Sequence, residues 1–187
     1  MKKTILIVTA ICLMEMCNMT FAQELQFLGI PLGTESTVFN HRLMNKGFTW
    51  ITGIDNTTNR EYRGELKGDF WKVRDCKIYL KSYYSDNTGK SMPITEAWVI
   101  IPTDGMQTDE FAKLYLELIS DFVDKYGDPS EIKNPSGEAQ TIWHLNNGDI
   151  YVETIMTFSI RLRYVSSLRL RQIEEANRFK GNGSNDL

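Results

Sequence analysis

The sequence predicts an α+β fold in which two helices pack on one face of an antiparallel β-sheet. Three observations predict this class: two segments with helical periodicity, two regions in which apolar residues recur at every second position, and turn-forming residues between them. The predicted order is strand, helix, four strands, helix and three strands, which describes two helix-plus-meander halves. No linker-like segment divides these halves, so we expect a single α+β domain over residues 23–180.

The first predicted helix follows a short strand and a turn containing proline and glycine. Thr34 or Ser36 is the expected N-terminal cap, because a hydroxyl oxygen there accepts a hydrogen bond from an early helical N–H. Phe39 and Leu43 lie four residues apart and form its apolar side. Gly47 suits the left-handed conformation that closes a helix. We expect this short helix to cover a sheet.

The region 48–103 changes to a period of two. Runs such as CKIYLKSYY and ITEAWVIIP are rich in aromatic and β-branched residues, and clusters of Asn, Asp, Gly and Lys separate them. This pattern predicts a meander of about four antiparallel strands. The run AWVIIP is apolar at successive positions, so we expect it in the middle of the sheet or beneath a helix.

The second predicted helix lies in TDEFAKLYLELISDFVDKYGDP, with Thr108 as the expected cap and Gly127 as its closing residue. Its apolar stripe has helical spacing and consists of Phe111, Leu114, Tyr115, Leu118 and Phe122. Such a stripe predicts that one side of this helix belongs to the hydrophobic core.

The remaining segment begins with a predicted polar loop, residues 130–140. Three strand-like runs follow, and Asn147-Gly148 between the first two predicts a hairpin. The run LRQIEEANRF is compatible with a final helix. Residues 181–187 are predicted to be a flexible C-terminal tail.

Residues 1–22 have the order of a secretory signal peptide. Lys2 and Lys3 form a positive head, residues 4–14 are apolar, and small residues ending at Ala22 precede the expected cleavage position. The apolar run is too short for a stable membrane anchor. The alternative is a lipoprotein signal with Cys17 as the lipidated residue, which the charged residue close before it disfavours. We therefore expect an exported bacterial protein in the periplasm, associated with the outer membrane or extracellular, without a transmembrane segment after cleavage.

Charge and cysteine content limit the function further. The net charge of −3 argues against bulk attraction to nucleic acid or anionic lipid. Cys76 is the one cysteine beyond the predicted signal, so no disulfide within the domain is expected. Cys76 is more simply explained as a small buried apolar group than as a catalytic nucleophile, since no histidine lies near it in the sequence.

Three segments resemble those of small exported proteins of unknown function from Bacteroides-type bacteria. They are GIPLGTESTVFNHRLMNKGF, YRGELKGDFWKVRDCKIYL and KYGDP. The chain departs from that group in the hairpin, where residues 68–76 form a longer segment and leave the register of two strands open. The alternation of helix and meander also resembles the β-lactamase-inhibitor-protein-like fold, related units of which occur in small lipoproteins of the outer-membrane assembly machinery. A fold alone does not carry a function from one protein to another. What the resemblance implies is a binding or assembly role on a sheet face.

The sequence holds no strong catalytic or metal-binding pattern. His41 and His144 lie outside any Gly-x-Ser-x-Gly or His-x-x-x-His pattern, and phosphate-loop and dinucleotide motifs are absent. Glu96 and Glu153, both in predicted strands, are the one carboxylate pair that we would test for hydrolysis. We therefore expect no catalytic residue, no metal and no cofactor.

A basic run near the C-terminus is the strongest candidate for a binding site. In SIRLRYVSSLRLRQ a strand would place its arginines on one face, and these are Arg161, Arg163, Arg169 and Arg171. Two interpretations stay open: a solvated face that discourages edge pairing, or a patch whose guanidinium groups bind an anionic ligand or partner. Tyr83 and Tyr84 flank a predicted hairpin tip and are further candidate binding residues.

Together these patterns favour an exported, non-catalytic binding or interaction module of the bacterial cell envelope. Its partner would be an envelope protein or a glycan rather than nucleic acid. The first alternative is an envelope-assembly or inhibitor-like factor that grips one protein partner. The second is a hydrolase that uses Glu96 or Glu153.

Overall fold

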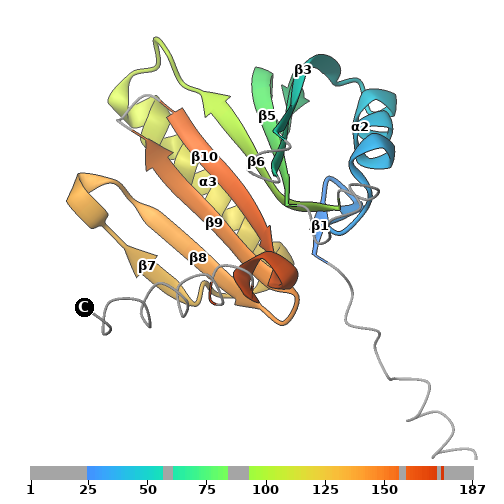
Figure 1. Ribbon diagram of the computed structural model, residues 1–187. Helices are drawn as coiled ribbons and strands as arrows, with labels where there is room; N and C mark the ends of the chain where they lie inside the picture. The colour runs from blue at the N-terminus through green and yellow to red at the C-terminus, as the bar shows by residue number, and fades with distance from the viewer. Residues whose placement is uncertain (1–24, 57–60, 84–92, 156–158, 172–173, 175–187) are drawn as a thin grey trace, which may run out of the picture.

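The computed structural model describes residues 25–56, 61–83, 93–155, 159–171 and 174 (Figure 1). Within them eight strands form one antiparallel sheet in the order β3-β4-β5-β6-β10-β9-β8-β7, and β1 and β2 form a separate small hairpin. The strands are β1 (Gln26–Phe27), β2 (Ile30–Pro31), β3 (Thr49–Asn56), β4 (Glu61–Phe70), β5 (Val73–Tyr83), β6 (Ile94–Pro102), β7 (Glu131–Lys133), β8 (Gln140–Leu145), β9 (Gly148–Ile155) and β10 (Ser159–Ser166). The helices are α2 (Ser36–Asn45) and α3 (Thr108–Tyr126), and η1 (Pro135–Gly137) is a short 3-10 helix.

The two predicted halves are both present. Helix α2 precedes the meander β3–β6, and helix α3 precedes the meander β7–β10. The last strands of the two meanders, β6 and β10, pair antiparallel over seven residue pairs and join the halves into one continuous sheet. The α+β class and its helix-plus-meander organisation are therefore confirmed.

The second meander has one more strand than the sequence predicted. Residues Glu131–Lys133, expected within a polar loop, form the edge strand β7 and pair with β8, and η1 follows them. Three residues are too few for alternation to be recognised. A short edge strand of this kind also offers little backbone for pairing with another chain.

One face of the sheet forms the hydrophobic core. Residues directly opposite one another on paired strands share a face, and the register joins Ile78, Val99, Leu162 and Val152 in one row across four strands. All four are fully buried. Strand β6, with its AWVIIP run, lies between β5 and β10 and so occupies the middle of the sheet, as predicted.

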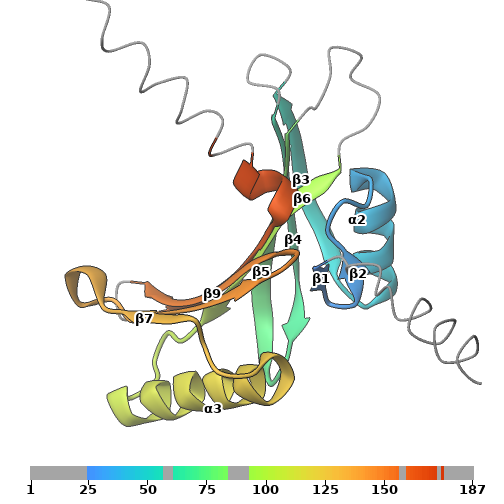
Figure 2. The ribbon, with the colours of Figure 1, turned by 90° about the horizontal axis from the view of Figure 1, so that it is seen from below.

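Both helices pack on this core face (Figure 2). Asn40 Nδ2 of α2 donates to the hydroxyl of Tyr62 on β4 at 2.8 Å. The ring of Phe122 on α3 lies 6.4 Å from that of Tyr164 on β10 and 5.5 Å from that of Trp143 on β8. Among the described residues, no helix combines the length and apolarity needed to cross a bilayer.

The ends of the helices agree only in part with the predicted ends. Both predicted N-caps are wrong: Glu35 is the N-cap of α2 without a side-chain hydrogen bond, and Gln107 caps α3 in a capping box with Glu110. Thr34 lies one residue before the observed cap of α2, and Ser36 and Thr108 are the first helical residues of α2 and α3. Composition alone does not place a helix end to within one residue. Gly47 and Gly127 close the helices with positive φ angles, as predicted.

The β4–β5 hairpin, whose register the sequence left open, turns tightly. Phe70 pairs with Val73, and the turn residue Trp71 has a φ of 54°. A positive φ is costly for a bulky residue. Contacts with α3 offset this cost, because the indole Nε1–H of Trp71 donates to Asp121 Oδ2 at 2.7 Å.

The β8–β9 hairpin also differs slightly from prediction. Leu145 pairs directly with Gly148, so Asn147 is a turn residue while Gly148 already belongs to β9. A Cβ atom at Gly148 would lie 2.1 Å from the carbonyl oxygen of Val165. Glycine is therefore required there for the close approach of β9 to β10.

The remaining predicted segments lie outside the described residues. These are the signal peptide 1–22, the tail 181–187 and most of the predicted final helix.

Candidate ligand-binding face of the sheet

The face of the sheet opposite α2 and α3 is the candidate functional site, and we call it the polar face. The register places one row of side chains on it from β4 to β9. In order the row is Glu65, Tyr79, Trp98, Arg163 and Tyr151. Each of these side chains is half-buried. Strand alternation, with core residues at the intervening positions, is what directs these polar and aromatic groups to a common surface.

Two buried glutamates of the polar face are paired with arginines. Arg163 Nε donates to Glu96 Oε1 at 2.7 Å, and Arg161 Nε donates to Glu153 Oε2 at 2.5 Å. The glutamate side chains are 5% and 9% exposed, whereas Arg163 and Arg161 are 30% and 38% exposed. Burying a carboxylate is tolerated only when it is paired and hydrogen-bonded. The glutamates therefore fix guanidinium groups that remain accessible to a ligand.

The other oxygens of these glutamates also have partners. Gln140 Nε2 donates to Glu153 Oε1 at 2.6 Å, and Arg169 Nε lies 3.9 Å from Glu96 Oε2. The two residues considered for hydrolysis are thus each paired with candidate binding arginines: Glu96 with Arg163 and Arg169, and Glu153 with Arg161. Its geometry suits the anchoring of arginines better than proton transfer to a substrate.

Arg169 and Arg171 do not continue the strand, so the prediction that all four arginines share a strand face is wrong. Residues 167–171 are helical, and β10 ends at Ser166. The backbone N–H of Arg169 donates to Ser166 Oγ at 3.3 Å, the arrangement of a serine N-cap. The Ser166-Ser167 pair was the sequence signal for this helix start. Arg169 still reaches the polar face through Glu96, while Arg171 is exposed.

The two candidate tyrosines add nothing to the described site. Tyr83 is the last residue of β5 and pairs with Glu61 in the backbone register. Tyr84 lies outside the described residues.

Aromatic side chains on the polar face form a platform whose residues were not among the predicted binding residues. The rings of Tyr79 and Trp98 are stacked, with centroids 5.5 Å apart and an interplanar angle of 20°. The Lys81 ammonium lies 5.3 Å from the Trp98 ring centroid, and the Arg163 guanidinium lies 5.4 Å from that of Tyr151. The alternation of Glu96 and Trp98 with core residues was the available signal.

A hollow of about 360 Å³ lies over this platform. It is lined by Thr52, Arg63, Gly64, Glu65, Tyr79, Leu80, Lys81 and Trp98. These residues come from four neighbouring strands, β3 to β6, which together span about 14 Å across the sheet. The volume is within the range of sites for small ligands or single units of a polymer.

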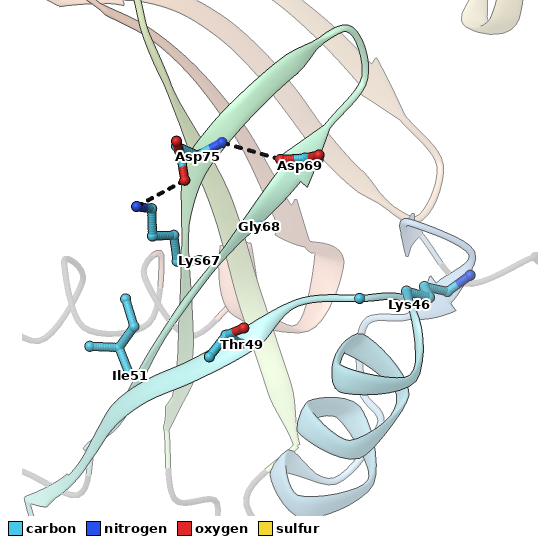
Figure 3. Close-up of a pocket in the computed structure, with 8 residues that line it drawn as sticks. Lys46, Thr49, Ile51, Lys67, Gly68, Asp69 and Asp75 are labelled. Carbon is cyan, nitrogen blue, oxygen red and sulfur yellow. Dashed lines mark hydrogen bonds and ion pairs between the residues drawn. The ribbon is translucent and has the colours of Figure 1, made fainter.

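A second hollow, of about 480 Å³, lies beside the C-terminal end of α2 (Figure 3). Three of its charged residues contact one another: Lys67 Nζ lies 2.9 Å from Asp75 Oδ1, and the Asp75 N–H donates to Asp69 Oδ1 at 3.4 Å. Aromatic side chains are absent from its lining. We therefore regard the hollow over Tyr79 and Trp98 as the better candidate.

His144 is part of a charged cluster at the other end of the polar face. Its Nδ1 lies 3.0 Å from Asp149 Oδ1, and its Nε2 lies 3.2 Å from Glu131 Oε1. These hydrogen bonds, first to Asp149 and then to Glu131, raise the pKa of His144 above its usual value of 6.5. The hydroxyl of Tyr151 also donates to Asp149, at 2.9 Å. The cluster connects strands β7, β8 and β9.

His41 and Cys76, the other residues considered for catalysis, do not contribute to the polar face. His41 is exposed on α2, next to Asn45 Nδ2 at 3.3 Å. Cys76 is fully buried, and desolvation raises the pKa of its thiol to about 11. Within the described part of the chain, no three His, Cys, Asp or Glu side chains are arranged to hold a metal ion.

Comparisons with known proteins identify no relative. No protein-family model matches the chain, and no curated protein or solved structure is significantly similar to it. The functional argument therefore rests on the geometry of the polar face.

Proposed function

We propose that this chain is a non-catalytic binding module of the bacterial cell envelope and that the polar face of its sheet is the binding surface. The observation that carries the proposal is the row Glu65, Tyr79, Trp98, Arg163 and Tyr151, which is half-buried on the face that neither α2 nor α3 covers. Aromatic and arginine side chains of this kind supply most of the binding energy at recognition surfaces.

The ion pairs support this proposal. Retaining buried glutamates costs solvation free energy, and well-packed apolar residues would serve stability as well or better. Glu96 and Glu153 instead hold Arg163 and Arg161 in fixed orientations with part of each guanidinium exposed. Side chains held in place before a ligand arrives lose less conformational entropy on binding.

The cellular location is proposed from the N-terminal pattern alone. Lys2, Lys3 and the apolar run that follows support export to the periplasm, the outer membrane or the cell exterior. Mass spectrometry of the protein recovered from the producing cells tests this directly. A chain that begins at Gln23 supports cleavage after Ala22, a chain that begins at lipidated Cys17 supports the lipoprotein alternative, and an unprocessed chain in the cytoplasm contradicts export.

The binding surface is tested by matched charge reversals on opposite faces. The purified protein and two variants are each screened against a glycan panel and against fractionated envelope extract. The variants are K81E, on the polar face, and K113E, at an exposed position of α3. Both variants change the net charge equally, so nonspecific electrostatics affect them alike. We expect K81E to lose the retained ligand and K113E to keep it. Equal loss in both variants, or no retained ligand at all, would contradict the proposal.

A second candidate function is an assembly or inhibitor-like factor that grips a single protein. The extended polar face and the partly exposed Arg161 and Arg163 favour it, because arginine forks suit carboxylates on a partner. Crosslinking in envelope fractions would then give one stoichiometric protein partner. The hydrolase alternative predicts instead that E96Q or E153Q abolishes a measurable hydrolysis while the fold stays intact.

A further inference from the structure

We propose that the hollow over Tyr79 and Trp98 is a subsite for an acidic saccharide, with the sugar ring against the aromatic platform and its carboxylate toward Lys81 and Arg63. The inference rests on the proposed binding function and adds the class of ligand. It concerns the part of the polar face formed by strands β3 to β6.

The platform favours a ring-shaped ligand. Tyr79 and Trp98 are cross-strand neighbours, and each of their stacked rings covers one face of the other and is half-buried beside the hollow. A ligand in the hollow therefore meets the outer face or the edge of these rings. One side of a pyranose ring presents C–H groups, which pack on the negative face of an aromatic ring. Its hydroxyl groups lie around the rim, where Thr52 and Glu65 border the hollow and provide donors and acceptors.

The charges favour an acidic form of such a ring. Two cationic side chains, Arg63 and Lys81, line the hollow together with one carboxylate, that of Glu65. The Lys81 ammonium lies 5.3 Å from the Trp98 ring centroid, so it can contact the carboxylate of a sugar that packs beside this ring.

The charge pattern of the opposite side differs. Helix α3 carries Asp109, Glu110, Glu117, Asp121 and Asp124 against Lys113 and Lys125. An anionic ligand is therefore repelled from the helix side and directed to the sheet side.

The position of the hollow disfavours a peptide. Extended peptides are commonly recognised by adding a strand to a free sheet edge, where backbone groups lack partners. Strands β4, β5 and β6 are each paired on both sides, so their backbone groups are already used in the sheet. Strand β3 is a sheet edge, but it contributes only Thr52 to the lining. Recognition over Tyr79 and Trp98 must come from side chains, namely aromatic rings and cations, and a saccharide satisfies that requirement.

The test is calorimetric titration of the purified protein with tetrasaccharides of galacturonate, mannuronate and hyaluronan, with neutral glucose tetramers and tetraglutamate as comparison ligands. We expect at least one acidic tetrasaccharide to bind about tenfold or more tightly than the neutral tetramer and the peptide. W98L should weaken that binding about tenfold, and K81Q should remove most of the preference for the acidic sugar. K113Q, at an exposed position of α3 away from the polar face, should leave binding unchanged within about twofold.

Urea unfolding and circular dichroism establish that each variant is folded, and W98F and Y79L replace W98L should it not fold. Equal binding of the neutral sugar or the peptide, equal loss in K81Q and K113Q, or no saturable binding of any acidic tetrasaccharide overturns the inference. If acidic saccharides fail while another ligand is lost specifically in K81E, the inference is wrong and the proposed binding function stands. If no ligand depends on the polar face, both are wrong.

Discussion

Removing the charge of Arg163 tests whether the polar face is organised by its buried ion pairs. R163M keeps an apolar stem but leaves Glu96, only 5% exposed, with Arg169 at 3.9 Å as its remaining cation. Removing one partner of a buried pair costs about 3–5 kcal/mol. Because Arg163 itself is partly exposed and Arg169 compensates in part, we expect a loss of about 2–3 kcal/mol in the free energy of unfolding.

The assay is urea unfolding followed by far-UV circular dichroism. With a slope of about 2 kcal/mol per molar urea, the midpoint of R163M should fall by about 1–1.5 M. The double variant E96L/R163M removes both charges and should recover to within about 1 kcal/mol of the parent. K72M breaks a pair whose partners are 58% and 40% exposed, Lys72 and Glu117, and should change stability by less than about 0.5 kcal/mol.

Two results would refute this reasoning. One is an equal, small shift for R163M and K72M, which would mean that the Glu96 pair is as solvated as a surface pair. The other is an E96L/R163M variant whose loss of stability equals the sum of the losses in E96L and R163M measured separately, which would mean that Glu96 and Arg163 are not energetically coupled.

Three further changes are predicted. The raised pKa of His144 contributes stability that is fully present below about pH 6.5 and is lost as pH rises through the pKa of the folded state. H144Q should therefore reduce the decline of the urea midpoint above pH 6.5, and the same dependence of the midpoint on pH in H144Q and the parent would refute this. G148A should lower the free energy of unfolding by about 2 kcal/mol or more, because the added Cβ would collide with the Val165 carbonyl oxygen. A thermal midpoint equal to the parent's would show that β9 can shift away from β10 without loss of stability. F122A should cost about 3–5 kcal/mol, whereas L116A at an exposed position of the same helix should cost under about 0.5 kcal/mol; similar values would place Phe122 outside the core.

Much of the fold could be predicted because its signals are local. The apolar stripe of α3 and the closing residues Gly47 and Gly127 depend on spacings of a few residues, and all three predictions are confirmed. The position of AWVIIP in the middle of the sheet follows equally from its composition. In contrast, β7 is only three residues long, so its pairing is decided by the neighbouring strand and not by its own pattern.

The site was harder to predict because its contacts are remote in sequence. Arg163 and Glu96 are 67 residues apart, and only the β6–β10 register brings them together. The sequence therefore identified the arginines and glutamates separately, without their pairing. The helical turn at Arg169 was missed because period-two alternation continued through it, although Ser166 was available as a cap.

The most direct test of the account uses tryptophan side chains as reporters. The indole N–H signals of the four tryptophans are followed by nitrogen-15 NMR while the acidic tetrasaccharides and envelope fractions are added. Trp98 lies on the polar face, Trp71 contacts α3, and the Trp143 Nε1–H donates to the Gly127 carbonyl in the interior. The account predicts a saturable shift of the Trp98 signal with Trp71 and Trp143 unmoved. A ligand that shifts Trp71 and leaves Trp98 in place would contradict it.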